Sequence, residues 1–85
     1  MTGSLLADAV TGRRVRITSV DLEGDAADWL AAVGLHEGEE LTVLRRAALG
    51  GPLHVRSAGG GEFAVAREVA AKITVVSILV SAEEP

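Results

Sequence analysis

The segment LAAVGLHEGEEL, from Leu30 to Leu41, contains the change of structure on which the fold prediction depends. Gly34 stands where a helix ends in the left-handed conformation, and Leu35 can fold back onto the last helical turn. Gly38 supplies a second backbone break four residues later, and LTVL then begins an extended stretch. We therefore predict a helix that ends at Gly34, an acidic turn, and then a strand.

Strand patterns lie on both sides of this helix. The stretch Arg14–Val20 begins with alternating apolar and polar positions, which is typical of a strand with one buried face. Asp25 is a candidate N-cap for the helix. Four further strands are predicted after the helix, at residues 41–44, 53–56, 62–65 and 73–80, with one helical turn at 67–72. About five strands with one short helical insertion indicate a mainly β chain that forms a small, strongly bent barrel, a single domain over residues 1–85.

The predicted core is aliphatic, because 48% of the 85 residues are hydrophobic but only 2% are aromatic. Its expected members are Val15, Ile17, Leu30, Val33, Leu35, Leu41, Val43, Leu53, Val55, Phe63, Val65, Ile73 and Val75. The chain has no cysteine, which excludes disulfides and a thiolate zinc site. A net charge of −4 argues against nucleic-acid binding.

The sequence contains no motif that indicates an enzyme. There is no Gly-x-Ser-x-Gly elbow, and Gly59-Gly60-Gly61 lacks the further residues of a dinucleotide or phosphate loop. Trp29 and Phe63 alone cannot form the aromatic groove that binds proline-rich peptides. The first ten residues do not resemble a signal peptide, and the longest apolar run is too short to span a bilayer. We expect a cytoplasmic, non-enzymatic protein with no cofactor and no direct membrane insertion.

The acidic turn is a candidate metal site. His36 and Glu40 have the i, i+4 spacing that places two ligands on one helix face, but Gly38 argues against a helix here. A site for a divalent transition metal would have to use the two histidines and two of the glutamates: His36, Glu37, Glu40 and His54. Their spacing matches no ligand pattern, so we favour a solvated turn.

Three motifs in the same order resemble those of the FeoA family. Leu30-x-x-Val33-Gly34-Leu35-x-x-Gly38 is similar to its L-x-x-L-G-(L/M)-x-P-G segment, and Leu49-Gly-Gly-Pro-Leu53 to its L-G-D-P-(I/L) turn. The ending x-(L/F)-A-L-R … I-x-V resembles Glu62-Phe-Ala-Val-Ala-Arg67 and Ile73-Thr-Val75. The similarity extends from residue 5 to about residue 75. Glu37 replaces the family's proline and Gly51 its aspartate, at turn positions that we expect to tolerate the change.

The resemblance implies an SH3-like β-barrel with a helical insertion. FeoA proteins are small cytoplasmic components of bacterial ferrous iron uptake, and their implied partner is the cytoplasmic GTPase part of a membrane ferrous iron permease. The partner would hold the chain at the inner face of the membrane. The same fold occurs as the C-terminal domain of iron- and manganese-dependent repressors, so fold alone does not fix function. The alternative is a stand-alone SH3-like module that binds a protein unrelated to iron.

Trp29 is the candidate anchor for a partner, because aromatic side chains carry much of the binding energy at interfaces. The alternative is that Trp29 covers the edge of the barrel beside Val33. We expect the contact surface to combine the helix with the turn after the second predicted strand, placed beside it. Its residues are Asp28, Trp29, Leu49, Gly50, Gly51, Pro52 and Leu53.

The last predicted strand, Ile73–Val80, is apolar on both faces and suggests a homo-oligomer. Its far half could pair or pack with another subunit, since exposed apolar edges favour association. Alternatively, residues 77–80 fold back over the open end of the barrel with Leu5 and Leu6.

Overall fold

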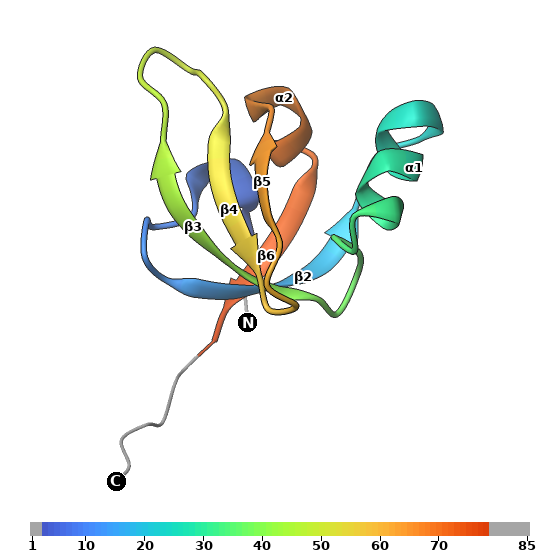
Figure 1. Cartoon of the computed structure of the whole chain (residues 1–85), viewed down its shortest axis with the longest axis horizontal. Coiled ribbons are helices and arrows are strands. Elements are labelled where there is room, and N and C mark those ends of the chain that lie inside the picture. Colours follow the sequence, from blue (N-terminus) through green and yellow to red (C-terminus); the bar gives the residue numbers. More distant parts are fainter. Residues whose placement is uncertain (1–2, 79–85) are drawn as a thin grey trace, which may run out of the picture.

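The computed structural model describes residues 3–78, which form one antiparallel sheet of six strands and three short helices (Figure 1). The strands are β1 (Ser4–Leu5), β2 (Arg14–Val20), β3 (Glu40–Arg46), β4 (Leu53–Ser57), β5 (Glu62–Val65) and β6 (Ile73–Ser77). The helices are the 3-10 helix η1 (Leu6–Asp8), α1 (Gly24–Ala32) and α2 (Arg67–Ala70). The mainly β class and the helical insertion are confirmed, whereas β1 and η1 were not predicted.

The sheet is strongly bent, as predicted, but it does not close into a barrel. The strand order is β1-β6-β2-β3-β4-β5, so β1 and β5 lie at opposite ends of the sheet described by residues 3–78. Register shifts between Ile17 and Ser19 in β2, and between Val43 and Arg45 in β3, bend the strands where an extra residue enters the pairing. These bends curve the sheet around the core without joining its two edges.

The helix α1 ends as its sequence predicts. The Leu35 N–H donates to the Leu30 carbonyl at 2.8 Å and the Gly34 N–H to the Ala31 carbonyl at 3.1 Å. Together with the positive φ of +89° at Gly34, these bonds form a Schellman motif. The predicted N-cap at Asp25 is wrong: the chain enters the helix through Gly24, whose φ is +66°, and Asp25 lies in the first turn.

The core contains all of the predicted residues except Val33 and Phe63, which are partly buried against it. The unpredicted members come from the short helices and their flanks: Leu6, Ala7, Ala9 and Ala70. The Arg46 guanidinium donates to the carbonyls of Ala7 and Ala9, which fixes η1 against the sheet. A three-residue helix shows no periodicity in sequence, so this part of the core was missed.

The strand β6 is an internal strand. It pairs with β2 from Ile73 to Ser77 and with β1 at Thr74 and Val75, so β6 does not lie at an end of the sheet. The Ile78 N–H donates to the Arg14 carbonyl at 3.1 Å, and Leu79 and Val80, the last two residues of the predicted association segment, lie outside the described residues. Leu6 is fully buried, whereas Leu5, which was named with it as a cover for the open end of the barrel, is 39% exposed. Within residues 3–78, no helix is long and apolar enough to cross a membrane.

Candidate functional site

The acidic segment after α1 is a turn. The Gly38 N–H donates to the Ile17 carbonyl at 2.8 Å and the Glu39 N–H to the His36 carbonyl at 3.0 Å. His36 and Glu37 are exposed, and His36 Nδ1 lies 3.0 Å from the Glu37 carbonyl oxygen. Because the segment is not helical, the i, i+4 spacing in this stretch does not align two ligands.

The other two metal candidates, Glu40 and His54, have different partners. One carboxylate oxygen of Glu40 lies 2.9 Å from Arg16 Nη2, and the other lies 3.9 Å from Arg14 Nη1. His54 Nε2 lies 3.2 Å from a carboxylate oxygen of Glu62. In the part of the chain that the structure describes, no three side chains of His, Asp or Glu form a group that could hold a metal ion.

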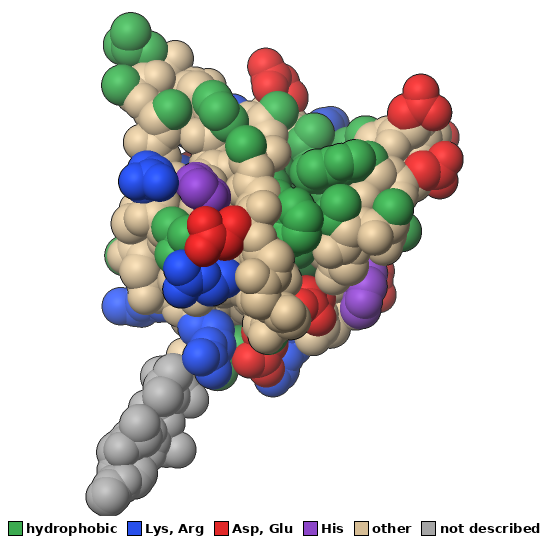
Figure 2. Space-filling model, viewed as in Figure 1, with side chains coloured by type: hydrophobic (Ala, Val, Ile, Leu, Met, Phe, Trp, Pro, Cys, Tyr) green, Lys and Arg blue, Asp and Glu red, His purple; other side chains and the backbone are tan. Residues whose placement is uncertain are grey.

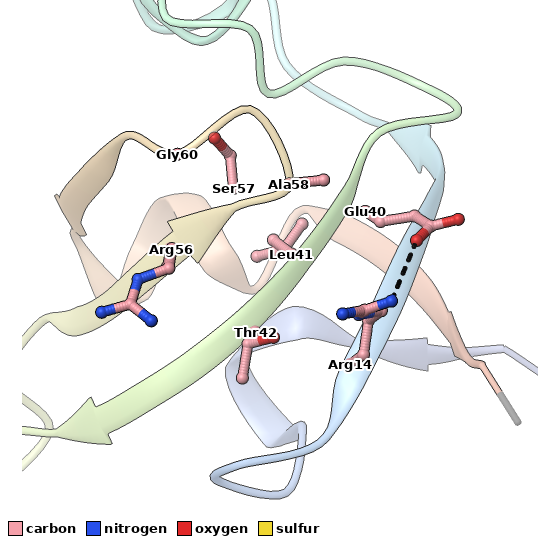
Figure 3. Close-up of a pocket in the computed structure, with 8 residues that line it drawn as sticks. All are labelled: Arg14, Glu40, Leu41, Thr42, Arg56, Ser57, Ala58 and Gly60. Carbon is pink, nitrogen blue, oxygen red and sulfur yellow. Dashed lines mark ion pairs between the residues drawn. The ribbon is translucent and has the colours of Figure 1, made fainter. Parts of the chain in front are cut away.

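The outer face of the sheet carries a row of polar side chains, Arg14, Thr42 and Arg56, on neighbouring positions of β2, β3 and β4. They line a hollow of about 240 Å³ that also includes Glu40 and Ser57 (Figure 3). The guanidinium groups of Arg14 and Arg56 point away from each other in this view. Arg14 is paired with Glu40 and Arg56 with Glu62, and surface ion pairs of this kind contribute little to stability.

The carboxylate of Glu62 is the centre of the second ion cluster. Arg56 donates to one oxygen of Glu62 from Nη2 at 2.8 Å and from Nε at 3.1 Å, and His54 approaches the other oxygen. The hydrogen bond from Arg56, followed by its charge, holds the pKa of Glu62 below its ordinary value of 4.5, with a smaller contribution from His54. This cluster connects β4 to β5 at the exposed face of the sheet.

Trp29 is packed against the edge of the sheet and is also partly exposed. Its ring packs edge-on against the ring of Phe63 on β5, with centroids 6.4 Å apart and an interplanar angle of 86°. At the same time 42% of the residue stays exposed. Figure 2 shows hydrophobic side chains gathered on the surface between β5 and α1. Trp29 therefore covers the edge strand with one part of its ring and presents another part to solvent.

The turn between β3 and β4 exposes its leucine. Leu49 is fully exposed and has a φ of +58°, and the next residue, Gly50, has a φ of +75°. At Gly51 a Cβ atom would lie 2.7 Å from the Cβ of Ala47, so this backbone fits the glycine that replaces the family's aspartate and leaves little room for a side chain. Leu53 was predicted as a contact residue, but its side chain is fully buried in the core.

The predicted contact surface is divided between two places. Figure 1 shows the β3–β4 turn and α1 on opposite sides of the molecule, with β4, β5 and α2 between them. Asp28 and Trp29 are exposed on α1, whereas Leu49, Gly50 and Pro52 are at least partly exposed on the turn. The expectation that the turn lies beside the helix is therefore wrong, because the curvature of the sheet separates the two segments.

A hollow beside α1 was not predicted from the sequence. Its volume is about 240 Å³, and its lining is mostly apolar: Val20, Leu22, Ala27, Leu30, Ala31, Leu35, His36 and Glu37. The signal in the sequence is the pair of small residues Ala27 and Ala31, one helical turn apart, which leaves space on one face of the helix.

A family model described as FeoA domain matches residues 5–77 of the chain. No match was found among curated proteins.

Several solved structures have the same fold. The FeoA protein from Chlorobium tepidum is 36% identical, with a TM-score of 0.79, and the match covers 95% of this chain and 75% of that one. Stenotrophomonas maltophilia FeoA in complex with zinc, a procaryotic SH3 domain protein, is 26% identical with a TM-score of 0.71, covering 86% and 89%. A manganese-dependent transcriptional repressor is 22% identical with a TM-score of 0.82; the match covers 92% of this chain but only 38% of the repressor. The repressor match shows likeness of fold alone.

Proposed function

The chain belongs to the FeoA family, and on this premise we propose that it is an accessory protein of ferrous iron uptake. It contacts the cytoplasmic GTPase part of a membrane ferrous iron permease and acts by binding, without catalysis of its own. The net charge of −4 and the lack of a spanning helix in residues 3–78 are compatible with a protein that reaches the inner face of the membrane through its partner.

The observation that carries the proposed contact is the state of Trp29. It is the only tryptophan of the chain, it lies on a short helix, and 42% of it is exposed. Contact with Phe63 holds the ring in place, so little side-chain freedom is lost when a partner binds. Half-buried aromatic side chains that are already ordered are suited to act as anchors at interfaces.

The test is capture of the partner from membranes. The tagged chain is incubated with solubilised membranes of its iron-starved host, and the retained proteins are identified by mass spectrometry. We expect a ferrous iron permease to be retained, and Trp29→Ala to lower its recovery at least tenfold. Loss of the edge contact should also lower the thermal midpoint, by about 5 °C, because aromatic pairs contribute roughly 1 kcal/mol.

The matched control is Phe63→Ala, which removes the other ring of the same pair. It lowers the thermal midpoint as well, but it leaves the exposed ring of Trp29 on the helix. If both variants lose the permease equally, destabilisation explains the result and Trp29 is not an anchor. If the wild-type chain retains a soluble regulator and no permease, the alternative of a stand-alone regulatory module replaces this proposal.

A further inference from the structure

The side chain of Leu49 is an exposed apolar knob. It is fully exposed and stands at the tip of the turn between β3 and β4. Its φ of +58° is a conformation that leucine rarely adopts, because Cβ then approaches the following carbonyl oxygen. An exposed leucine in a strained backbone contributes nothing to the core, and strained residues of this kind concentrate at binding sites.

The hollow beside α1 has the size and the lining that such a knob requires. Its volume of about 240 Å³ exceeds that of a cavity of ~150 Å³ that takes benzene, and aliphatic side chains form its floor. Leu30 and Leu35 at the floor are 1% exposed and are fixed by the Schellman motif, so the hollow is preformed. Ala31 lies exposed at its side.

The Leu49 turn and the hollow beside α1 are surrounded by charges of opposite sign. No lysine or arginine occurs between Ile17 and Leu44, whereas this segment contains seven acidic residues, of which Glu40 is paired with Arg14 and Arg16. The other six are Asp21, Glu23, Asp25, Asp28, Glu37 and Glu39. Figure 2 shows acidic side chains on the α1 side of the molecule. Lys72, whose carbonyl accepts a bond from the Asp21 N–H, adds one positive charge nearby.

Basic residues accompany the turn that carries Leu49. Arg45 precedes it and is exposed, and the Cδ of Arg67 lies 3.8 Å from the position of a Cβ atom on Gly50. Arg46 also precedes the turn, but its guanidinium donates to the carbonyls of Ala7 and Ala9. Glu68, next to Arg67, is the acidic residue that adjoins this group in sequence. A positively charged turn is thus matched to a negatively charged hollow, which favours an encounter between them.

We infer that copies of this chain associate head to tail, with Leu49 of one copy seated in the hollow beside α1 of the next. The knob cannot enter the hollow of its own chain, since the turn and α1 lie on opposite sides of the molecule (Figure 1). A contact between two different surfaces does not close at two copies, so further copies can add in the same way. One leucine and its surroundings make a small interface, and the association is weak and favoured by low salt.

The test is sedimentation equilibrium of the purified full chain between about 0.05 and 1 mM at low salt, the range in which weak contacts are populated. The weight-average mass should rise with concentration beyond that of a dimer. Leu49→Asn removes the knob and retains a residue that tolerates a positive φ. Ala31→Trp obstructs the hollow from an exposed helix position. Each variant should lower the association constant at least tenfold.

Mixing the two variants provides the decisive result. The Leu49→Asn chain keeps a free hollow and the Ala31→Trp chain keeps a free knob, so an equimolar mixture should form a dimer of one of each and nothing larger. Val10→Asn, at another exposed apolar residue, and Ala32→Trp, at the neighbouring helix position, are the matched controls and should associate like the wild type. Circular dichroism of each variant excludes a loss of folding.

A wild-type chain that stays monomeric at the highest concentration overturns the inference, and so does a mixture that forms no dimer. The hollow would then be left to a different protein. The inference does not depend on the proposed function, since it concerns the purified chain alone. A monomeric chain that still retains a permease leaves the iron-uptake role intact, and an associating chain that retains none leaves the head-to-tail contact intact.

Discussion

Two glycine-containing turns of this chain hold a leucine in opposite environments. After α1, Gly34 takes a φ of +89° and the following residue, Leu35, is 1% exposed. Between β3 and β4, Leu49 itself takes a φ of +58°, ahead of Gly50, and is fully exposed. The residue types are the same, but the order of glycine and leucine is reversed.

The order of the two residues decides what each turn contributes. When glycine takes the left-handed position, the next residue folds back onto the helix and joins the core. When leucine takes that position, it costs about 1–2 kcal/mol of backbone energy, and no burial offsets this cost. The first turn therefore stabilises the fold, whereas the second is explained by a contact outside the folded chain.

The largest expected effect is that of Leu35→Ala. Truncating a fully buried leucine side chain to alanine costs ~2–5 kcal/mol of stability. The cost is the sum of the lost free energy of transfer from water and the free energy of the cavity that remains. A chain of this size has a free energy of unfolding of roughly 5–15 kcal/mol, so the urea midpoint should fall steeply. Leu49→Ala is the matched control and should change the free energy of unfolding by less than about 0.5 kcal/mol. Equal effects of the two substitutions would contradict the comparison.

Leu49→Gly should have a smaller effect of the opposite sign. Glycine relieves the cost of the left-handed backbone, but it adds conformational freedom to the unfolded chain. The difference predicts a gain of roughly 0.5–1 kcal/mol in the free energy of unfolding, which differential scanning calorimetry would detect as a higher thermal midpoint. A lower midpoint would mean that Leu49 packs against its own chain, and the head-to-tail contact would lose its knob.

The sequence predicts best where a local pattern decides the structure. The alternation that begins at Arg14 gives β2 with its observed bounds, and Gly34 marks the observed end of α1. In both cases the residues that set the conformation are neighbours in sequence. The burial of the predicted core follows for the same reason, since the period of each element fixes which side chains face inward.

Features that depend on how distant elements meet were not predictable. The sheet stays open because of its strand order and the bends in β2 and β3, and neither produces a sequence pattern. The same curvature separates Leu49 from Trp29 and brings Trp29 onto Phe63 of β5. The candidate contact residues could thus be named from the sequence, but their arrangement could not.

The smallest effect on the thermal midpoint is expected for a substitution of Glu62, whose side chain faces solvent. The hydrogen bond and the charge of Arg56 lower the pKa of Glu62 below 4.5, and His54 adds to this effect. Since the pKa is lower in the folded state than in the unfolded state, ionised Glu62 stabilises the fold above pH 4.5, and this contribution is lost as the pH falls through the folded-state value. Glu62→Gln should therefore lower the thermal midpoint slightly at neutral pH, by less than Leu49→Gly raises it, and the two chains should converge in acid. Added salt should shrink the difference. If Glu62→Gln lowers the thermal midpoint by more than Leu49→Gly raises it, exposed side chains of this chain contribute substantially to its stability. Exposure of Leu49 would then not be enough to explain how the two turns differ.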